Sequence, residues 1–481
     1  MKFSILVLFA FPPTTLGQWA PGDPCPTAIE VTERRDETFT TMDSIHAAML
    51  ACPNIETLKM YVGFGGCMRL RDRQNLPFRL AGGERYASAP LALSLAGYAM
   101  DENEWEAIQR EGPPWGLPLE LQLNYWRRWL QRRFIPSTQR SKTNLDLWLD
   151  AMDFSRIHTL QLNESDGRYV LTDQVVQKLP SRLTSLKSLS VYRPIAEGFI
   201  VSLPRNSLRH LSWQNAQRSG WDCTPESREF SLEAVLRHHG ASLVTLDYRE
   251  EETMRCPPPP FSLSHLRQLA SLAPNLKHLT IDLSREYSPT NGTQAGWPWS
   301  KLQTIASSFP SLTDLTIHFE LASECQRRTV NFEPLHPDDR CDGPCVGLER
   351  LAQPLLNRAS ATEMARFLWR HNLNGRADAS QGQGHGGQQL KSVSFRAGAW
   401  RVDGNERYFG PWLEGKRAWA DCRLDWDDKG VDGEGSGSDV AVVCEAGDTL
   451  GLKDWAEKCH DRAVARLGVA EENSAQVALL G

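Results

Sequence analysis

A ten-residue pattern recurs along the chain and constrains its fold more than any other feature. The segment PNLKHLTIDL (274–283) returns as PSLTDLTIHF (310–319), and looser copies occur elsewhere. In each copy an apolar residue at position i is followed by others at i+3 and i+5, as in Leu276, Leu279 and Ile281. Segments with helical periodicity precede most copies. Because one helix–strand unit cannot bury its own apolar face, the repeats predict a stacked solenoid with a parallel sheet.

The copies cover most of the chain and are unevenly spaced. Copies are 22 residues apart between Leu186 and Leu208 and 42 apart between the weak copy at Leu348 and Leu390. Leucine-rich repeats run about 20 to 29 residues, so we expect full helices and insertions on the helical side. The remaining copies begin at Ile55, Pro90, Ile157, Leu243, Leu276 and Leu312. Helices are predicted over 40–51, 144–154, 231–239, 263–272, 301–309 and 363–371.

The ends of the chain differ from the array. Residues 1–17 are typical of a secretory signal peptide, with Lys2, a short apolar run and a small-residue cleavage site before Gln18. A buried N-terminal strand is the alternative. The predicted solenoid occupies residues 18–396 and begins with an extended lead-in over 18–40. Residues 397–481 are expected to be an irregular cap over the last repeat, with a strand near 440–444 and a closing helix over 452–468.

An insertion at about residues 101–142 interrupts the array. It contains a basic, aromatic helix that carries Arg127, Arg128, Arg132 and Arg133. A helix of this kind either presents a solvated basic face or lies on an anionic surface. The low-complexity stretch 375–389 is predicted to be a loop.

The cysteines and the net charge indicate an exported protein that does not bind nucleic acid. The chain has 11 Cys, an odd number, so at least one thiol is free or pairs between chains. Plausible pairs are Cys52 with Cys67, Cys223 with Cys256, and Cys325 with Cys341 or Cys345. Asn163 and Asn291 lie in glycosylation triplets. A net charge of -6 argues against nucleic acid, and no stretch beyond the signal is apolar enough to span a membrane.

Strand alternation predicts which side chains of each copy face away from the core. Residues at i+3 and i+5 face the core, whereas i+2, i+4 and i+6 face the concave side of the sheet. Neighbouring strands lie about 4.8 Å apart, which places His278 beside Asp314 and Asp282 beside His318. We expect this polar row to be the binding face, with contact residues Tyr192, His210, Asp247, Arg249, His278, Asp282, Asp314, His318 and Arg396.

The histidines and aspartates of this row allow two interpretations. One is a cross-strand ladder of opposite charges that stabilises the sheet and offers a polar contact face. The other is a metal or acid–base site made of His278, Asp282, Asp314 and His318. No G-x-S-x-G, P-loop or H-E-x-x-H motif occurs, and the sequence indicates no cofactor.

The L-x-x-L-x-[LIV] cores at Leu276 and Leu312 resemble those of ribonuclease-inhibitor-like leucine-rich repeats, which also occur in F-box/LRR proteins. The resemblance covers roughly residues 55 to 396. It implies an α/β horseshoe with a parallel concave sheet and helices on the convex side. It also implies use in protein recognition.

Three functions are compatible with these features. The first is a secreted, non-enzymatic recognition scaffold that binds an unknown protein through the concave face. The second is an extracellular hydrolase or metal-dependent enzyme with an unfamiliar site. The third, an intracellular F-box-like adaptor, requires that the N-terminus is not cleaved.

Overall fold

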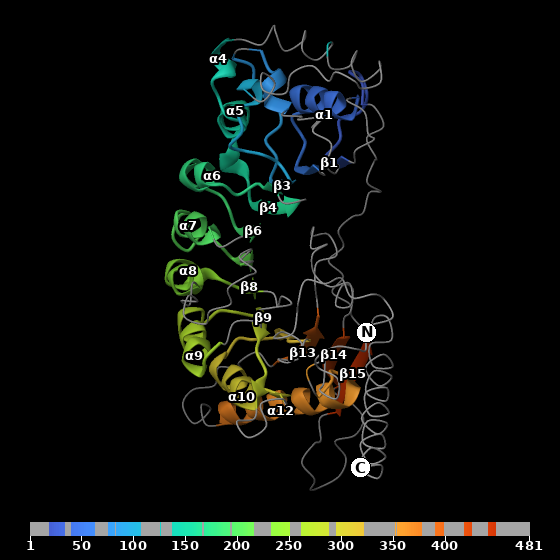
Figure 1. Cartoon of the computed structure of the whole chain (residues 1–481), viewed down its shortest axis with the longest axis vertical. Helices are drawn as coiled ribbons and strands as arrows, with labels where there is room; N and C mark the ends of the chain where they lie inside the picture. The colour runs from blue at the N-terminus through green and yellow to red at the C-terminus, as the bar shows by residue number, and fades with distance from the viewer. Residues whose placement is uncertain are drawn as a thin grey trace, which may run out of the picture. The chain divides into compact units, whose positions relative to one another are not determined.

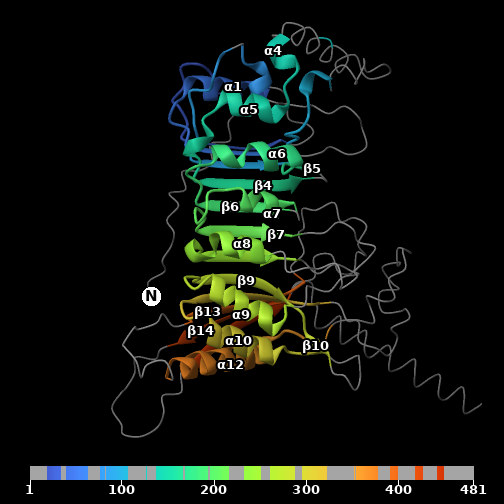
Figure 2. The same ribbon diagram turned by 90° about the vertical axis from the view of Figure 1, so that its left-hand side faces the viewer.

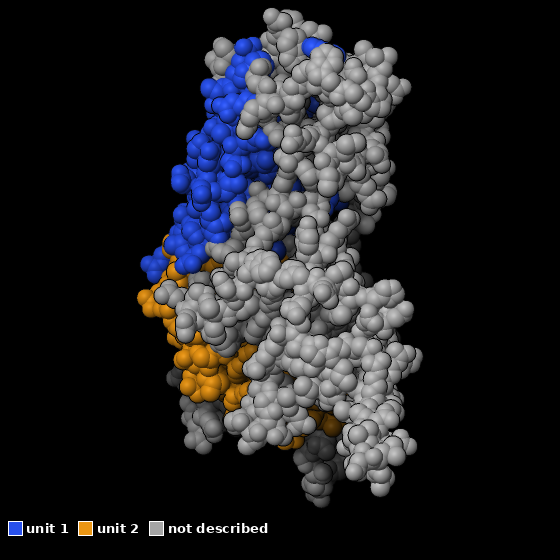
Figure 3. All heavy atoms as spheres, in the orientation of Figure 1, with its two compact units in different colours: residues 1–208 blue, residues 209–481 orange. Residues whose placement is uncertain are grey.

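The computed structural model describes the chain in two compact units, residues 1–208 (unit 1) and 209–481 (unit 2), coloured separately in Figure 3. The described residues are 19–33, 40–62, 76–106 apart from 82, 126, 137–192 apart from 166 and 167, 195–215, 232–250, 261–287, 295–321, 352, 354–377, 390–398, 418–425 and 441–448. The predicted signal peptide, Asn291, the weak copy at Leu348, the arginines of the insertion helix and the predicted helix over 452–468 lie outside the described residues.

Unit 1 is built on parallel strands that alternate with helices (Figure 1). Its parallel sheet has the order β1-β2-β3-β4-β6, and β5 pairs antiparallel with the end of β4. The strands are β1 (Ala28–Glu33), β2 (Thr57–Val62), β3 (Ala92–Ala96), β4 (Thr159–Ser165), β5 (Arg168–Tyr169) and β6 (Ser188–Tyr192). The helices are α1 (Thr40–Ala51), α4 (Ser137–Arg140), α5 (Asn144–Ala151), α6 (Asp173–Lys178) and α7 (Ala196–Val201), with 3-10 turns at Leu76–Arg79, Phe154–Arg156 and Pro180–Arg182.

Unit 2 continues the same alternation and ends in an antiparallel extension. Its sheet has the order β7-β8-β9-β12-β13-β14-β15, parallel from β7 to β13. The strands are β7 (His210–Gln214), β8 (Thr245–Arg249), β9 (His278–Leu283), β12 (Asp314–Phe319), β13 (Ser392–Ala397), β14 (Ala418–Asp425) and β15 (Ala441–Asp448). The helices are α8 (Leu232–His239), α9 (Leu263–Leu272), α10 (Trp299–Ser308) and α12 (Arg358–Ala377), with a 3-10 turn at Gly240–Ser242 and a short β10 (Glu286–Tyr287) and β11 (Ala295–Gly296) pair.

The strand register confirms the repeat pattern. Residues at i+3 of successive copies are direct neighbours in the sheet, so Leu246 pairs with Leu279 and Leu279 with Leu315. The same holds at i+5, where Ile281 lies opposite Ile317. All of these side chains are at most 1% exposed. The apolar residues of each copy therefore form continuous rows through the core, as stacking requires.

The backbone entering each strand shows the same repetition. The carbonyl at i+1 of one copy accepts the N–H groups at i+1 and i+2 of the next, as Lys277 O accepts from Thr313 N at 2.9 Å and Asp314 N at 3.0 Å. Thr27 O accepts in the same way from Glu56 N and Thr57 N. This identifies β1 as one more copy, with Pro26 in the first slot, within a segment predicted to be only an extended lead-in.

The helices predicted within the described residues form and lie on one face of each unit's sheet, as α1, α5, α8, α9, α10 and α12. Within unit 2, α8, α9 and α10 run side by side along that face (Figures 1 and 2). Side-chain caps fix several helix starts. Ser262 Oγ accepts from His265 N at 3.1 Å at the start of α9, and Thr143 makes a capping box with Asp146 at the start of α5. The architecture is therefore α/β, with a mostly parallel sheet in each unit.

The end of the array is closed by β-structure. Residues 440–444 were predicted to contain a strand, and β15 confirms this. β14 pairs antiparallel with β13, and β15 with β14. Trp419 lies opposite Gly447, where an added Cβ would come within 3.0 Å of the indole ring. The glycine thus leaves room for the ring to lie across β15.

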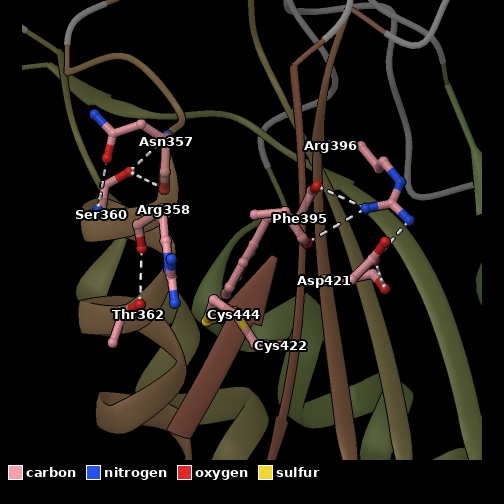
Figure 4. Close-up of a disulfide and its surroundings, with 11 residues drawn as sticks. Asn357, Arg358, Ser360, Thr362, Phe395, Arg396, Asp421, Cys422 and Cys444 are labelled. Carbon is pink, nitrogen blue, oxygen red and sulfur yellow. Dashed lines mark hydrogen bonds and ion pairs between the residues drawn. A yellow bond between two sulfur atoms is a disulfide. The ribbon is translucent and has the colours of Figure 1, made fainter. Parts of the chain in front are cut away.

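Two disulfides occur among the described residues, and one corrects the predicted pairing. Cys25 is bonded to Cys52 with Cα atoms 5.5 Å apart, so the proposed Cys52–Cys67 pair is wrong. The bond ties the loop before β1 to the end of α1. Cys422 and Cys444 are direct partners in β14 and β15 and form the second bond (Figure 4). The other proposed pairs involve Cys223, Cys256, Cys325, Cys341 and Cys345, which lie outside the described residues.

Candidate functional site

The candidate site is the sheet face of unit 2 that carries the residues at i+2, i+4 and i+6, here called the polar face. It lies opposite the face that packs on the helices, because side chains alternate along a strand. Its residues from β7 to β13 are His210, Ser212, Gln214, Thr245, Asp247, Arg249, His278, Thr280, Asp282, Asp314, Thr316, His318, Ser392, Ser394 and Arg396. Three lines of neighbouring side chains cross these strands.

The first line crosses the strand starts and is partly exposed. His278 Nδ1 lies 2.9 Å from Asp314 Oδ2, with side chains 48% and 41% exposed, which confirms the predicted neighbours. Ser392 Oγ donates to the other oxygen of the same carboxylate. His210 Nδ1 and Thr245 Oγ1 are 3.0 Å apart. Burial, then His278, then Arg209 lower the pKa of His210, so it stays neutral further into the acid range.

The second line, through the strand centres, pairs hydroxyl groups with carboxylates. Ser212 Oγ donates to Asp247 Oδ2 at 3.0 Å, and Ser394 Oγ donates to Asp421 Oδ1 at 2.6 Å. Arg396 lies two residues beyond Ser394 on the same face of β13. It joins this line because its Nη2 lies 2.7 Å from the Asp421 carboxylate (Figure 4). The line contributes mixed donors and acceptors and no apolar side chain.

The third line, at the strand ends, joins the buried side chains of Arg249 and Asp282 to the partly buried side chain of His318, and is here called the buried cluster. Arg249 Nε donates to both oxygens of Asp282, at 2.9 and 2.8 Å. The Asp282 carboxylate also accepts from Glu250 N at 2.9 Å. Arg249 Nη1 lies 3.2 Å from His318 Nε2. These bonds connect β8, β9 and β12 through charge-assisted contacts, which are about twice as strong as neutral ones.

This burial corrects part of the predicted contact surface. Arg249 and Asp282 were expected to point to solvent, but they are only 8% and 2% exposed. Their charges are buried together because an isolated charge away from water is costly, and mutual pairing offsets that cost. Both residues therefore serve the structure of unit 2. They are not exposed contact residues.

The structure does not bring the four residues of the proposed metal or acid–base site together. His278 pairs with Asp314, whereas Asp282 binds Arg249 at the other end of the strand. His278 and Asp282 are four positions apart on β9, or about 13 Å along an extended strand. The observed arrangement is the predicted cross-strand ladder, with an arginine inserted into its buried part.

Some polar residues beside the buried cluster were not predicted. They follow the strands, and strand alternation does not apply there. Asn215 Nδ2 donates to Glu250 Oε1 at 3.1 Å, and Asn215 N donates to Arg249 O at 2.7 Å. Tyr248 Oη donates to the same Glu250 carboxylate. Asn215 and Glu250 follow their strand cores directly, and this was the only sequence signal for them.

In unit 1 the corresponding face carries Tyr192 and Asn163, both half-buried. Ser94 Oγ donates to Gln161 Oε1 at 3.0 Å between β3 and β4, and Lys59 pairs with Glu30 between β2 and β1. Asn163 lies in β4 opposite Ala96, and its glycosylation remains a prediction. This face is therefore polar and mostly uncharged.

Within the part of the chain that the structure describes, no group of three or more His, Cys, Asp or Glu side chains could hold a metal ion. None of the helices within these ranges combines the length and apolar character needed to cross a membrane. In comparisons with models of known families, with curated proteins and with solved structures, nothing matches this chain.

Proposed function

We propose that this chain is a secreted, non-enzymatic recognition protein with a leucine-rich-repeat horseshoe, which binds a protein partner through the polar face. One observation carries the proposal. The common register places polar side chains from five strands, far apart in sequence, at neighbouring positions on one face. A repeat array builds an extended surface of this kind, and solenoid proteins use such surfaces for binding.

The chemistry of the polar face fits a protein partner. His278, Asp314 and Asp421 have side chains between 41% and 48% exposed and combine an imidazole with carboxylates. Serine and threonine hydroxyls between them both donate and accept. Interfaces between proteins carry about one hydrogen bond per 100 to 200 Å², and a surface of mixed donors and acceptors supplies them.

Secretion is supported by the predicted signal peptide and by the disulfides. Bonds such as Cys25–Cys52 persist in oxidising compartments and are rare in the cytosol. We expect the mature chain in the medium to begin at Gln18. Sequencing its N-terminus tests this. An intact Met1 on cytosolic protein would contradict secretion and favour the adaptor alternative.

Site-specific photo-crosslinking tests the binding face. A photoreactive residue at Thr280, in the middle of β9, should capture a partner from extracellular material. The same residue at Ser264, exposed on α9, is the matched control. Capture only from Ser264 would contradict the proposal. Turnover of glycan, ester or peptide substrates that is lost in His278→Ala would replace it with an enzymatic function.

A further inference from the structure

We propose that His318 is the trigger of an acid-sensitive lock in unit 2, in which uptake of a proton breaks its hydrogen bond to Arg249 and loosens the ends of β8, β9 and β12. This device operates within the fold and does not depend on the proposed partner. It rests on the geometry of the buried cluster of Arg249, Asp282 and His318.

The hydrogen-bond geometry fixes the protonation state of His318. An arginine side chain has five N–H donors and no acceptor. Because Arg249 Nη1 lies 3.2 Å from His318 Nε2, the imidazole nitrogen must accept this bond. The ring is therefore neutral, with its proton on Nδ1. A proton added at Nε2 would turn two donors toward each other and remove the bond.

The two N–H groups of a protonated His318 would find no acceptor in place. His318 Nδ1 is buried and makes no hydrogen bond within the described part of the chain. The nearest carboxylate by register is Asp282, directly opposite His318 in β9. Both of its oxygens already accept from Arg249, and one also accepts from Glu250 N. An imidazolium at this position would have to compete with the guanidinium for that carboxylate.

The charges around His318 also oppose its protonation. Arg249 faces it from β8 and Asp282 from β9, and Arg396 lies directly opposite in β13. Directly after β12, the acidic residue Glu320 accepts a hydrogen bond from Arg285 N through its carboxylate instead. The Arg249 guanidinium contacts the ring, and the Arg396 guanidinium adds a positive charge from the next strand, where it is itself paired with Asp421. Burial, then Arg249, then Arg396 hold the pKa of His318 well below its usual value.

The direction of the pH effect follows from this arrangement. In the unfolded chain an ordinary histidine has a pKa of about 6.5. On acidification His318 therefore binds a proton in the opened segment at a higher pH than in the native structure. This difference favours opening. The stability contributed by neutral His318 is present above about pH 6.5 and is lost below it. At pH 5.5 opening should be favoured by about tenfold, because one pH unit below the unfolded pKa corresponds to a factor of ten.

Hydrogen exchange measured by mass spectrometry on the full chain tests the lock. After correction for intrinsic exchange rates, peptides from β8, β9 and β12 should lose about tenfold in protection between pH 7.5 and 5.5. Peptides from β2 to β4 in unit 1 should not change in this way. Unchanged protection in β8, β9 and β12, or an equal loss in both units, would overturn the proposal.

Two variants assign the effect to one residue. His318→Gln keeps an acceptor for Arg249 but does not titrate, so it should abolish the acid-dependent loss. His278→Gln removes an imidazole that is 48% exposed and should retain the loss. The pKa of His210 is also lowered, so His210 is the other candidate for the effect. His318→Gln leaves His210 in place and therefore decides between these two histidines. An acid-dependent loss in His318→Gln equal to that of the wild type would refute the role of His318.

Discussion

Replacement of Arg249 by methionine tests the interpretation of the buried cluster in depth. Methionine keeps much of the apolar stem and removes the guanidinium group. Asp282, 2% exposed, would then keep a buried charge with only the Glu250 N–H as a described hydrogen-bond donor. The variant removes two hydrogen bonds to Asp282 and one to His318.

The expected loss is large because one partner of a buried pair remains. Hydrogen bonds to charged groups contribute about 1.5 to 3 kcal/mol each, and these are not additive. Breaking a buried ion pair by removing one partner costs about 3 to 5 kcal/mol. We expect Arg249→Met to lower the opening free energy of β8 and β9 by this amount. Arg249→Met with Asp282→Leu should recover most of the loss, because no unpaired charge remains.

Hydrogen exchange at pH 7.5 is the appropriate assay, because the chain has two units and global unfolding need not be two-state. Arg237→Met is the matched control. Its side chain is 68% exposed and pairs with Glu233 one turn away, so we expect a change within about 0.5 kcal/mol. Equal, small effects of both variants would refute the buried cluster and restore Arg249 as an exposed contact residue.

Three other substitutions give distinct expectations. Leu279→Ala removes a side chain that is 1% exposed in the central apolar row and should cost about 2 to 5 kcal/mol, measured by urea unfolding, together with lower secretion; a neutral result would mean that the strand faces are reversed. Gly240→Ala should cost about 1 to 3 kcal/mol because the added Cβ would overlap Leu272 O at the end of α9, and an unchanged thermal midpoint would contradict this close approach. His278→Ala should cost at most about 1 kcal/mol, since its pair with Asp314 is exposed, and a larger loss in urea would show that the pair is structural.

The strands and their register could be predicted because the repeat encodes both. Leucines at i+3 can form one row only if every copy enters the sheet in the same register. That alone places His278 beside Asp314 and Asp282 beside His318. The copy at Pro26 was missed, although it shares a proline in the first slot with the copy at Pro90. A proline there leaves the apolar residues at i+3 and i+5 in place. Only the first residue of the pattern then differs from the usual leucine or isoleucine.

The depth of the polar residues could not be predicted. Alternation gives the side of the sheet on which a residue lies, and it gives no measure of burial. Arg249 lies on the predicted side yet is buried, because its guanidinium reaches both oxygens of Asp282 on the neighbouring strand. The disulfide partner of Cys52 could not be predicted either. Cys25 lies in the lead-in, and its approach to α1 depends on β1 being a strand.

The affinity of the captured partner for two charge-matched variants tests the central claim most directly. Thr280→Arg places a long cation in the middle of the polar face, whereas Ser264→Arg places the same cation on α9. If the polar face binds the partner, Thr280→Arg should weaken binding at least about tenfold, or 1.4 kcal/mol, and Ser264→Arg should leave the Kd unchanged. Wild-type affinity in Thr280→Arg, with loss of binding in Ser264→Arg, would contradict the account.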